Sequence, residues 1–159
     1  DREGVPADRR VLAALGPRML TLSAERAAGA HPYLVPPAYD RFARGVLGDG
    51  PLLATEHKLV LGADRARTRE EARRGMAFYL GMRNYAANLE RLGYTVLDLA
   101  DDGSDVLIDA LVAQGGADQV ASELRAHLEA GADHVVAQAI PGESGLLGSL
   151  SRLAPALTS

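Results

Sequence analysis

The opening stretch, residues 10–37, has the apolar pattern of a strand, a helix and a second strand. Val11–Ala14 form a short apolar run, and apolar residues then recur with helical spacing after the turn Gly16–Pro17. Proline suits the first position of a helix, and we expect Gly29 to end this one. Ala30–Leu34 follows as the second strand. Because a helix of this length can connect neighbouring parallel strands, the pattern predicts a βαβ unit.

A third strand is predicted at residues 52–61, and its centre is unusually polar. Residues 55–58 read Thr-Glu-His-Lys, whereas a strand covered on both faces is normally apolar. Either the middle of this strand lines a cavity, or the strand lies at an edge of the sheet. Side chains alternate along a strand, so His57 should face away from Glu56 and Lys58, and at most one side can serve a single site. We therefore favour a charged edge or strand base over a catalytic cluster.

The segment from Gly62 to Asp133 reads as one long helical excursion that contains no convincing strand. A fourth strand, His134–Ile140, follows a glycine stop at Gly131. Ser144 is a candidate N-cap for a closing helix. The other helices expected along the chain span residues 37–47, 84–92, 104–113 and 119–130, together with one that begins at an N-cap, Asp64 or Thr68, and runs to about Gly81.

Four parallel strands joined by helices can form half of an eight-stranded β/α barrel or a small open doubly wound sheet. Residues 1–9 have the composition of an exposed arm or linker, residues 10–141 form the α/β unit, and residues 142–159 form a closing helix and tail. A complete barrel usually needs roughly 250 residues, so in the barrel interpretation about half of it is missing. The chain also begins with Asp1 instead of methionine, which favours the interpretation as a fragment.

Composition excludes several functional classes. The 159 residues include 17 basic and 21 acidic side chains, a net charge of −4, so we expect neither a nucleic acid partner nor an anionic membrane. Apolar runs are far shorter than a membrane span, and the polar start is unlike a signal peptide, which favours the cytoplasm. The chain has no cysteine, so disulfides and thiolate sites are excluded, and no histidines and carboxylates have metal-ligand spacing. Redox chemistry would need a bound cofactor.

The turn Gly16–Pro17 is the first candidate site, because the free N–H groups of the helix after it can bind a phosphate or a phosphate-bearing cofactor. An ordinary loop remains the alternative. His31 lies at the end of the next strand and is either functional or a hydrogen-bonded core residue. Gln138, near the carboxyl end of an apolar strand, can contact cofactor or substrate, or can be a satisfied core amide. His127 reads as a solvated helix residue, and His134 lies at the end of its strand remote from chemistry.

Several blocks of sequence together resemble a known family. They are Ala14–Leu20 (ALGPRML), Leu22–Pro37 (LSAERAAGAHPYLVPP), Tyr79–Tyr94 (YLGMRNYAANLERLGY) and Arg125–Gln138 (RAHLEAGADHVVAQ). In this order they resemble the carboxyl-terminal half of the bacterial luciferase-like monooxygenase family, and most closely the oxidoreductases that use the deazaflavin coenzyme F420. The resemblance implies a TIM barrel with insertions, of which this chain begins at about the fifth strand, and it implies a missing amino-terminal half.

The resemblance also implies a site at the carboxyl-terminal mouth of the barrel. Leu15, Gly16 and Pro17 match the turn that contacts the cofactor, and residues 31–33 match the end of the next strand. His31, Pro32 and Tyr33 stand where better understood members carry small hydroxyl or glycine residues and a lysine, so a ring-stacking or substrate-facing role becomes an alternative to a phosphate contact. Gln138 completes the candidate cofactor-binding set.

Family members transfer a hydride between the cofactor and a small organic substrate, and the flavin-using branch also activates oxygen. F420 is the expected cofactor, with flavin mononucleotide as the alternative. Most catalytic residues would lie in the amino-terminal half, and His31 is the one candidate in this chain. The block around Arg83, Tyr85 and Asn88 is expected to pack between helices or at a subunit interface of a homo-oligomer. Competing hypotheses are a phosphate-binding barrel lyase or isomerase and a non-catalytic half-barrel that binds a partner.

Overall fold

A computed structural model describes residues 4–141 and 145–158 of the chain. Its core is a sheet in which every paired strand runs parallel to its neighbour. The strands are β1 (Val11–Ala13), β2 (Gly29–His31), β3 (Leu52–Leu61), β4 (Val112–Gly115) and β5 (His134–Ala139). Helices connect these strands, so the predicted parallel α/β class is confirmed.

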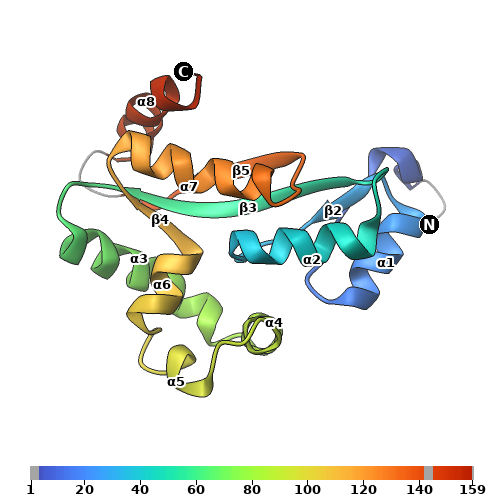
Figure 1. The fold of residues 1–159 in the computed structure, drawn as a ribbon, viewed down its shortest axis with the longest axis horizontal. Coiled ribbons are helices and arrows are strands. Elements are labelled where there is room, and N and C mark those ends of the chain that lie inside the picture. The colour runs from blue at the N-terminus through green and yellow to red at the C-terminus, as the bar shows by residue number, and fades with distance from the viewer. Residues whose placement is uncertain (1–3, 142–144, 159) are drawn as a thin grey trace.

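The long strand β3 organises the sheet and extends across most of the molecule (Figure 1). β1 pairs with β2, and β2 pairs with the first residues of β3 at Leu52 and Leu53. β4 pairs with the last residues of β3, while β5 follows the opposite edge from Ala54 to Leu59. Lys58 and Leu59 therefore have a strand on each side, which places the middle of β3 in the interior of the sheet.

Helices cover the sheet on both faces. Val60 packs with Met76 and Leu107 on one side of β3, whereas Leu59 packs with Leu124 and Leu153 on the other. The helices are α1 (Pro17–Arg26), α2 (Pro37–Leu47), α3 (Arg65–Leu80), α4 (Arg83–Arg91), α5 (Val96–Leu99), α6 (Asp105–Leu111), α7 (Ala117–Glu129) and α8 (Gly145–Thr158), preceded by a 3₁₀ turn, η1 (Ala7–Arg9). Among the residues described, none of these helices has the length and apolar character of a membrane span.

The predicted opening βαβ unit is confirmed, with one change at Gly29. The helix α1 ends at Arg26, and Gly29 is the first residue of β2 instead of the helix stop. The reason for glycine is the close approach of β3, since a Cβ on Gly29 would lie 2.0 Å from the carbonyl oxygen of Leu52. Helix α2 matches its predicted bounds, because Pro36 precedes it, Pro37 is its first residue and Gly48 closes it with a φ of 73°.

The prediction that the segment after Gly62 contains no strand before His134 is wrong. β4 occupies residues 112–115, which had been assigned in part to the preceding helix. Helix α6 ends at Leu111 and its C-cap, Val112, is already the first strand residue, so neither glycine nor proline separates the two elements. Pairing with the end of β3 determines the conformation of this short apolar segment.

The interpretation of the polar centre of β3 as a charged edge is also wrong. Thr55, Glu56, His57 and Lys58 are all buried, with at most 3% of any residue exposed. Such groups are tolerated in an interior strand only when each finds a polar partner. The closing helix is confirmed as α8, whose Leu153 packs against α7, while the candidate N-cap Ser144 lies outside the described residues.

Candidate functional site

A cavity of about 380 Å³ opens at the carboxyl ends of β1 and β2. Its volume falls within the usual range for small-molecule sites, roughly 300–1,000 Å³. It is lined by Ala13, Ala14, Leu15, Gly16, Met19, His31, Tyr33, Asn84, Tyr85, Ala87 and Arg91. The structure thus brings Leu15, Gly16, His31 and Tyr33 together as the sequence predicted, although their role as cofactor contacts stays a prediction.

The turn at Gly16 has the features of an anion site. Gly16 is the N-cap of α1, Pro17 occupies the first turn, and that turn contains no acidic side chain to neutralise the positive end of the helix dipole. The guanidinium of Arg91, from α4, lies beside it, since a Cβ on Gly16 would be 3.7 Å from Arg91 Nη2. A helix N-terminus and an arginine therefore border the same end of the cavity.

The segment after β2 is held in a fixed conformation. His31 Nδ1 lies 2.6 Å from the carbonyl oxygen of Ala54, and because a carbonyl only accepts, Nδ1 carries the proton and leaves Nε2 of the neutral ring as an acceptor. Leu34 has a left-handed φ of 62°, and its N–H donates to the carboxylate of Glu56 at 3.1 Å. Pro32 is buried and does not line the cavity.

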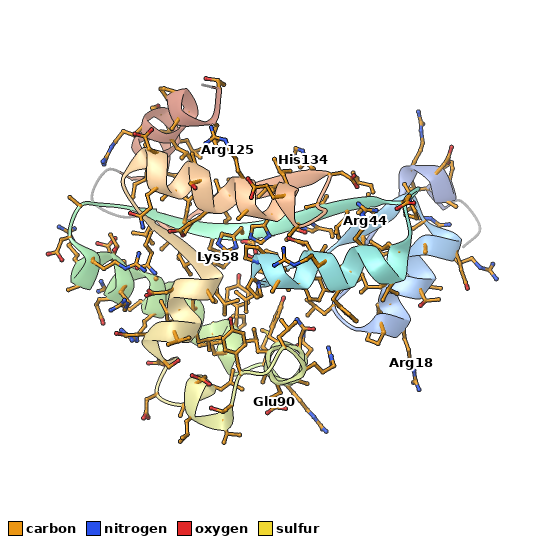
Figure 2. The ribbon with its side chains drawn as sticks, in the orientation of Figure 1. Arg18, Arg44, Lys58, Glu90, Arg125 and His134 are labelled. Atoms are coloured by element: carbon orange, nitrogen blue, oxygen red, sulfur yellow. The ribbon has the colours of Figure 1, made fainter. Side chains whose placement is uncertain are left out.

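A hydrogen-bonded group of side chains, the Lys58 cluster, lies next to the cavity and consists of Tyr33, Glu56, Lys58, Tyr79 and Gln138. Lys58 Nζ donates to Tyr33 Oη at 2.6 Å, to Gln138 Oε1 at 2.7 Å and to Glu56 Oε1 at 3.0 Å. It also lies 4.1 Å from the ring centroid of Tyr33 and 4.8 Å from that of Tyr79. Lys58, in the middle of β3 in Figure 2, thus has three oxygen acceptors and two aromatic faces.

Tyr33 belongs to both the cavity and the Lys58 cluster. Its hydroxyl donates to Gln138 Oε1 at 2.5 Å and lies 3.1 Å from the hydroxyl of Tyr79. Burial raises the pKa of Tyr33, with the charge of Glu56 acting in the same direction, although hydrogen bonds to Tyr79 and Gln138 oppose the shift. The phenol is therefore protonated at neutral pH and can donate a hydrogen bond.

A second polar group, the Asp40 network, lies on the opposite side of β3 between the sheet and the helices α2 and α7. His127 Nδ1 is 2.5 Å from Asp40 Oδ2, His127 Nε2 is 2.9 Å from His57 Nδ1, and Thr55 Oγ1 donates to Asp40 Oδ1 at 2.6 Å. Burial lowers the pKa of His57 to about 3, and neighbouring His127 lowers it further, against a hydrogen bond with the backbone of Val35. The predicted solvated position of His127 is wrong, because this side chain is completely buried.

The sequence placed some of these residues correctly and missed others. Alternation correctly put Glu56 and Lys58 on one face and His57 on the other, and Gln138 joins the first group. Tyr85 packs between helices as expected, with its ring centroid 5.7 Å from that of Tyr79, and it also lines the cavity. No sequence signal pointed to Arg91. Tyr79, Asn84 and Lys58 were likewise not assigned to the cofactor site. Exposed His134 begins β5, away from the carboxyl ends of the strands, as predicted.

No protein-family model and no curated protein matches the sequence. Two solved structures do match the fold. A coenzyme F420 dependent tetrahydromethanopterin reductase from Methanopyrus kandleri is 20% identical, with a TM-score of 0.64, over 82% of this chain and 44% of its own. An F420-dependent secondary alcohol dehydrogenase in complex with an F420-acetone adduct is 12% identical, with a TM-score of 0.63, over 92% of this chain and 48% of its own.

This chain has the fold of these enzymes. Both are named as F420-dependent enzymes, and the parallel α/β fold expected from the resemblance in sequence is confirmed over the part of their length that this chain covers. The chain spans about half the length of either structure.

Proposed function

We propose that this chain forms the cofactor-binding half of an F420-dependent oxidoreductase that transfers a hydride to or from a small organic substrate. The observation that carries the proposal is the cavity at the carboxyl ends of β1 and β2, with an uncompensated helix N-terminus and Arg91 at one end. Ligands of parallel α/β proteins bind at this edge of the sheet. Both structural neighbours are named as F420-dependent enzymes, which supports the choice of cofactor.

The residues around the cavity fit the chemical parts of a deazaflavin cofactor. The turn at Gly16 and the guanidinium of Arg91 would hold its phosphate, because backbone N–H groups and a fixed positive charge favour an anion there. Met19, Tyr33 and Tyr85 offer an apolar and aromatic wall for a planar ring. When bound, the cofactor supplies the hydride chemistry, and this chain binds it, orients it and shields it from water.

We assign the rest of the site, including its catalytic groups, to a part of the protein outside the 159 residues of this chain. Since the chain spans about half of each neighbour, we expect a second half-barrel to complete the fold and to contribute catalytic groups. We also propose that the protein is cytoplasmic and forms a homo-oligomer. Flavin mononucleotide remains the alternative cofactor, because it also combines a ring with a phosphate.

Fluorescence titration with oxidised F420, and in parallel with flavin mononucleotide, tests the proposal. We expect saturable F420 binding that Arg91→Ala weakens by about tenfold or more, since a charge-assisted hydrogen bond contributes about 1.5–3 kcal/mol. Arg26→Ala is the matched control, because Arg26 is exposed in the last turn of α1 and does not line the cavity.

The outcomes separate the alternatives. Tighter binding of flavin mononucleotide than of F420 would identify flavin mononucleotide as the cofactor and would leave the assignment of the binding site unchanged. Binding of inorganic phosphate that depends on Arg91, without binding of either cofactor, would instead support a phosphate-binding lyase or isomerase. Equal loss of F420 affinity in the Arg91 and Arg26 variants would refute the assignment of the anion site.

A further inference from the structure

The side chain of Gln138 has one of its two polar ends fixed. Oε1 accepts hydrogen bonds from Lys58 Nζ at 2.7 Å and from the hydroxyl of Tyr33 at 2.5 Å. An ammonium group can only donate, so the oxygen of this amide, and not its nitrogen, must face Lys58. The orientation of the amide therefore follows from chemistry, which is seldom true of a glutamine.

The opposite end of the amide carries two N–H donors. Among the residues that the structure describes, no hydrogen bond to Gln138 Nε2 is present, and Gln138 is exposed, so these donors are accessible. Gln138 is the second-last residue of β5 and pairs with Lys58, close to the carboxyl ends of the parallel strands. Tyr33 joins it to the cavity, because Tyr33 both lines the cavity and donates to Gln138.

We propose that Gln138 contacts the ligand through its amide N–H groups, which donate to a carbonyl oxygen of the bound cofactor ring or of the substrate. Lys58 acts on the ligand through Gln138 and is a positioning residue, whereas Tyr33 anchors Gln138 and also lines the cavity itself. This inference rests on the proposed function for the identity of the ligand. The ammonium of Lys58 is neutralised by Glu56 at 3.0 Å, so the cluster has no net charge to attract an anion, and a neutral carbonyl is the acceptor that suits it.

The fixed orientation can be tested without any ligand. The two side-chain N–H signals of Gln138 can be identified in an ¹⁵N NMR spectrum by their loss in Gln138→Glu. In the wild-type chain we expect the chemical shifts of these signals to differ from those of a free glutamine, and we expect their heteronuclear relaxation to be that of a rigid side chain. Tyr33→Phe removes one anchor and keeps the ring, and Lys58→Met removes the other anchor. We expect either change to move these signals toward those of a free glutamine and to increase their mobility, whereas unchanged signals in both folded variants would overturn the anchoring.

The contact with a ligand is tested by replacing the donor with an acceptor of the same shape. Gln138→Glu should weaken binding of oxidised F420 by about tenfold or more, because a carboxylate oxygen would then face a carbonyl oxygen. Gln119→Glu is the control, since it makes the same charge change at an exposed position on α7. Equal affinities of the Gln138→Glu and Gln119→Glu chains for F420 would rule out a cofactor contact.

The source of the carbonyl is decided by the same NMR signals. A shift of the Gln138 N–H signals with F420 assigns the contact to the cofactor ring, and a shift with acetone, used as a minimal ketone probe, assigns it to the substrate. A shift with neither probe would overturn the proposal for Gln138. Failure of the wild-type chain to bind F420 would overturn the proposed function instead, while the amide orientation and the acetone titration would still test Gln138.

Discussion

Acidification below about pH 6.5 should destabilise the chain through His57. Burial lowers the pKa of this histidine to about 3, whereas an unfolded histidine titrates near 6.5. Below pH 6.5 His57 therefore binds a proton in the unfolded state but stays unprotonated in the folded state. The folded state loses stability as pH falls from about 6.5 to about 3, and His57 contributes no such loss well above pH 6.5.

The magnitude follows from the two pKa values. Linkage with an unfolded pKa of 6.5 and a folded pKa of about 3 gives a loss of about 2 kcal/mol between pH 6.5 and 4.5. That amount is a large fraction of the usual stability of a domain, which is about 5–15 kcal/mol. The groups near His57 are His127, the adjacent Lys58, and Asp109 and Glu123, which line a 260 Å³ cavity together with it.

Urea denaturation followed by circular dichroism at steps between pH 7.5 and 4.5 provides the measurement. His57→Gln is the comparison, because glutamine can keep a hydrogen bond with His127 and does not titrate. We expect the variant to lose about 2.5 kcal/mol less than the wild-type chain between pH 7.5 and 4.5. If the two unfolding free energies fall in parallel with pH, then His57 is not held neutral and the reasoning fails.

Three further substitutions test the packing of the sheet by urea denaturation. Lys58→Met should lower the free energy of unfolding by about 3–5 kcal/mol, because it leaves the buried carboxylate of Glu56 without its ion-pair partner. Adding Glu56→Gln to this variant should restore much of the lost stability. Strictly additive effects of the two substitutions would contradict a direct coupling. Gly29→Ala should cost more than about 2 kcal/mol, since its Cβ would collide with the carbonyl oxygen of Leu52, and a neutral effect would show that β2 can move away from β3. Leu34→Gly relieves about 1–2 kcal/mol of left-handed backbone strain, but it removes a buried side chain that contributes about 2–5 kcal/mol. We therefore expect the variant to be less stable than the wild-type chain. A more stable variant would show that the strain dominates.

The elements that the sequence predicted best are those whose ends are marked by proline or glycine. Helix α2 begins after Pro36 and ends before Gly48, so its bounds could be predicted from single residues. β4 could not be, because its four residues continue the apolar pattern of α6 and become a strand only by pairing with β3. The decisive partner lies more than 50 residues earlier in the chain, as the register of Lys58 with Val112 shows.

The candidate site was predictable where it depends on strand alternation and strand ends. His31, Tyr33 and Gln138 follow from the position of the carboxyl ends, whereas Arg91 comes from a helix whose placement depends on tertiary packing. His127 is a different case, because a usable signal existed. It follows Val120 and Leu124 at helical spacing on the buried face of α7, and the polarity of its side chain concealed that pattern.

The central place of β3 also has a consequence for synthesis on the ribosome. One edge of β3 pairs with β5, whose first residue, His134, comes long after Leu61, the last residue of β3. At roughly 5–20 residues per second, translation of the intervening segment takes on the order of 4–15 s. During that time a purely apolar β3 would be an exposed template for association with other chains. We expect the charges of Glu56 and Lys58, which are buried in the finished sheet, to keep the nascent strand hydrated until its partner emerges.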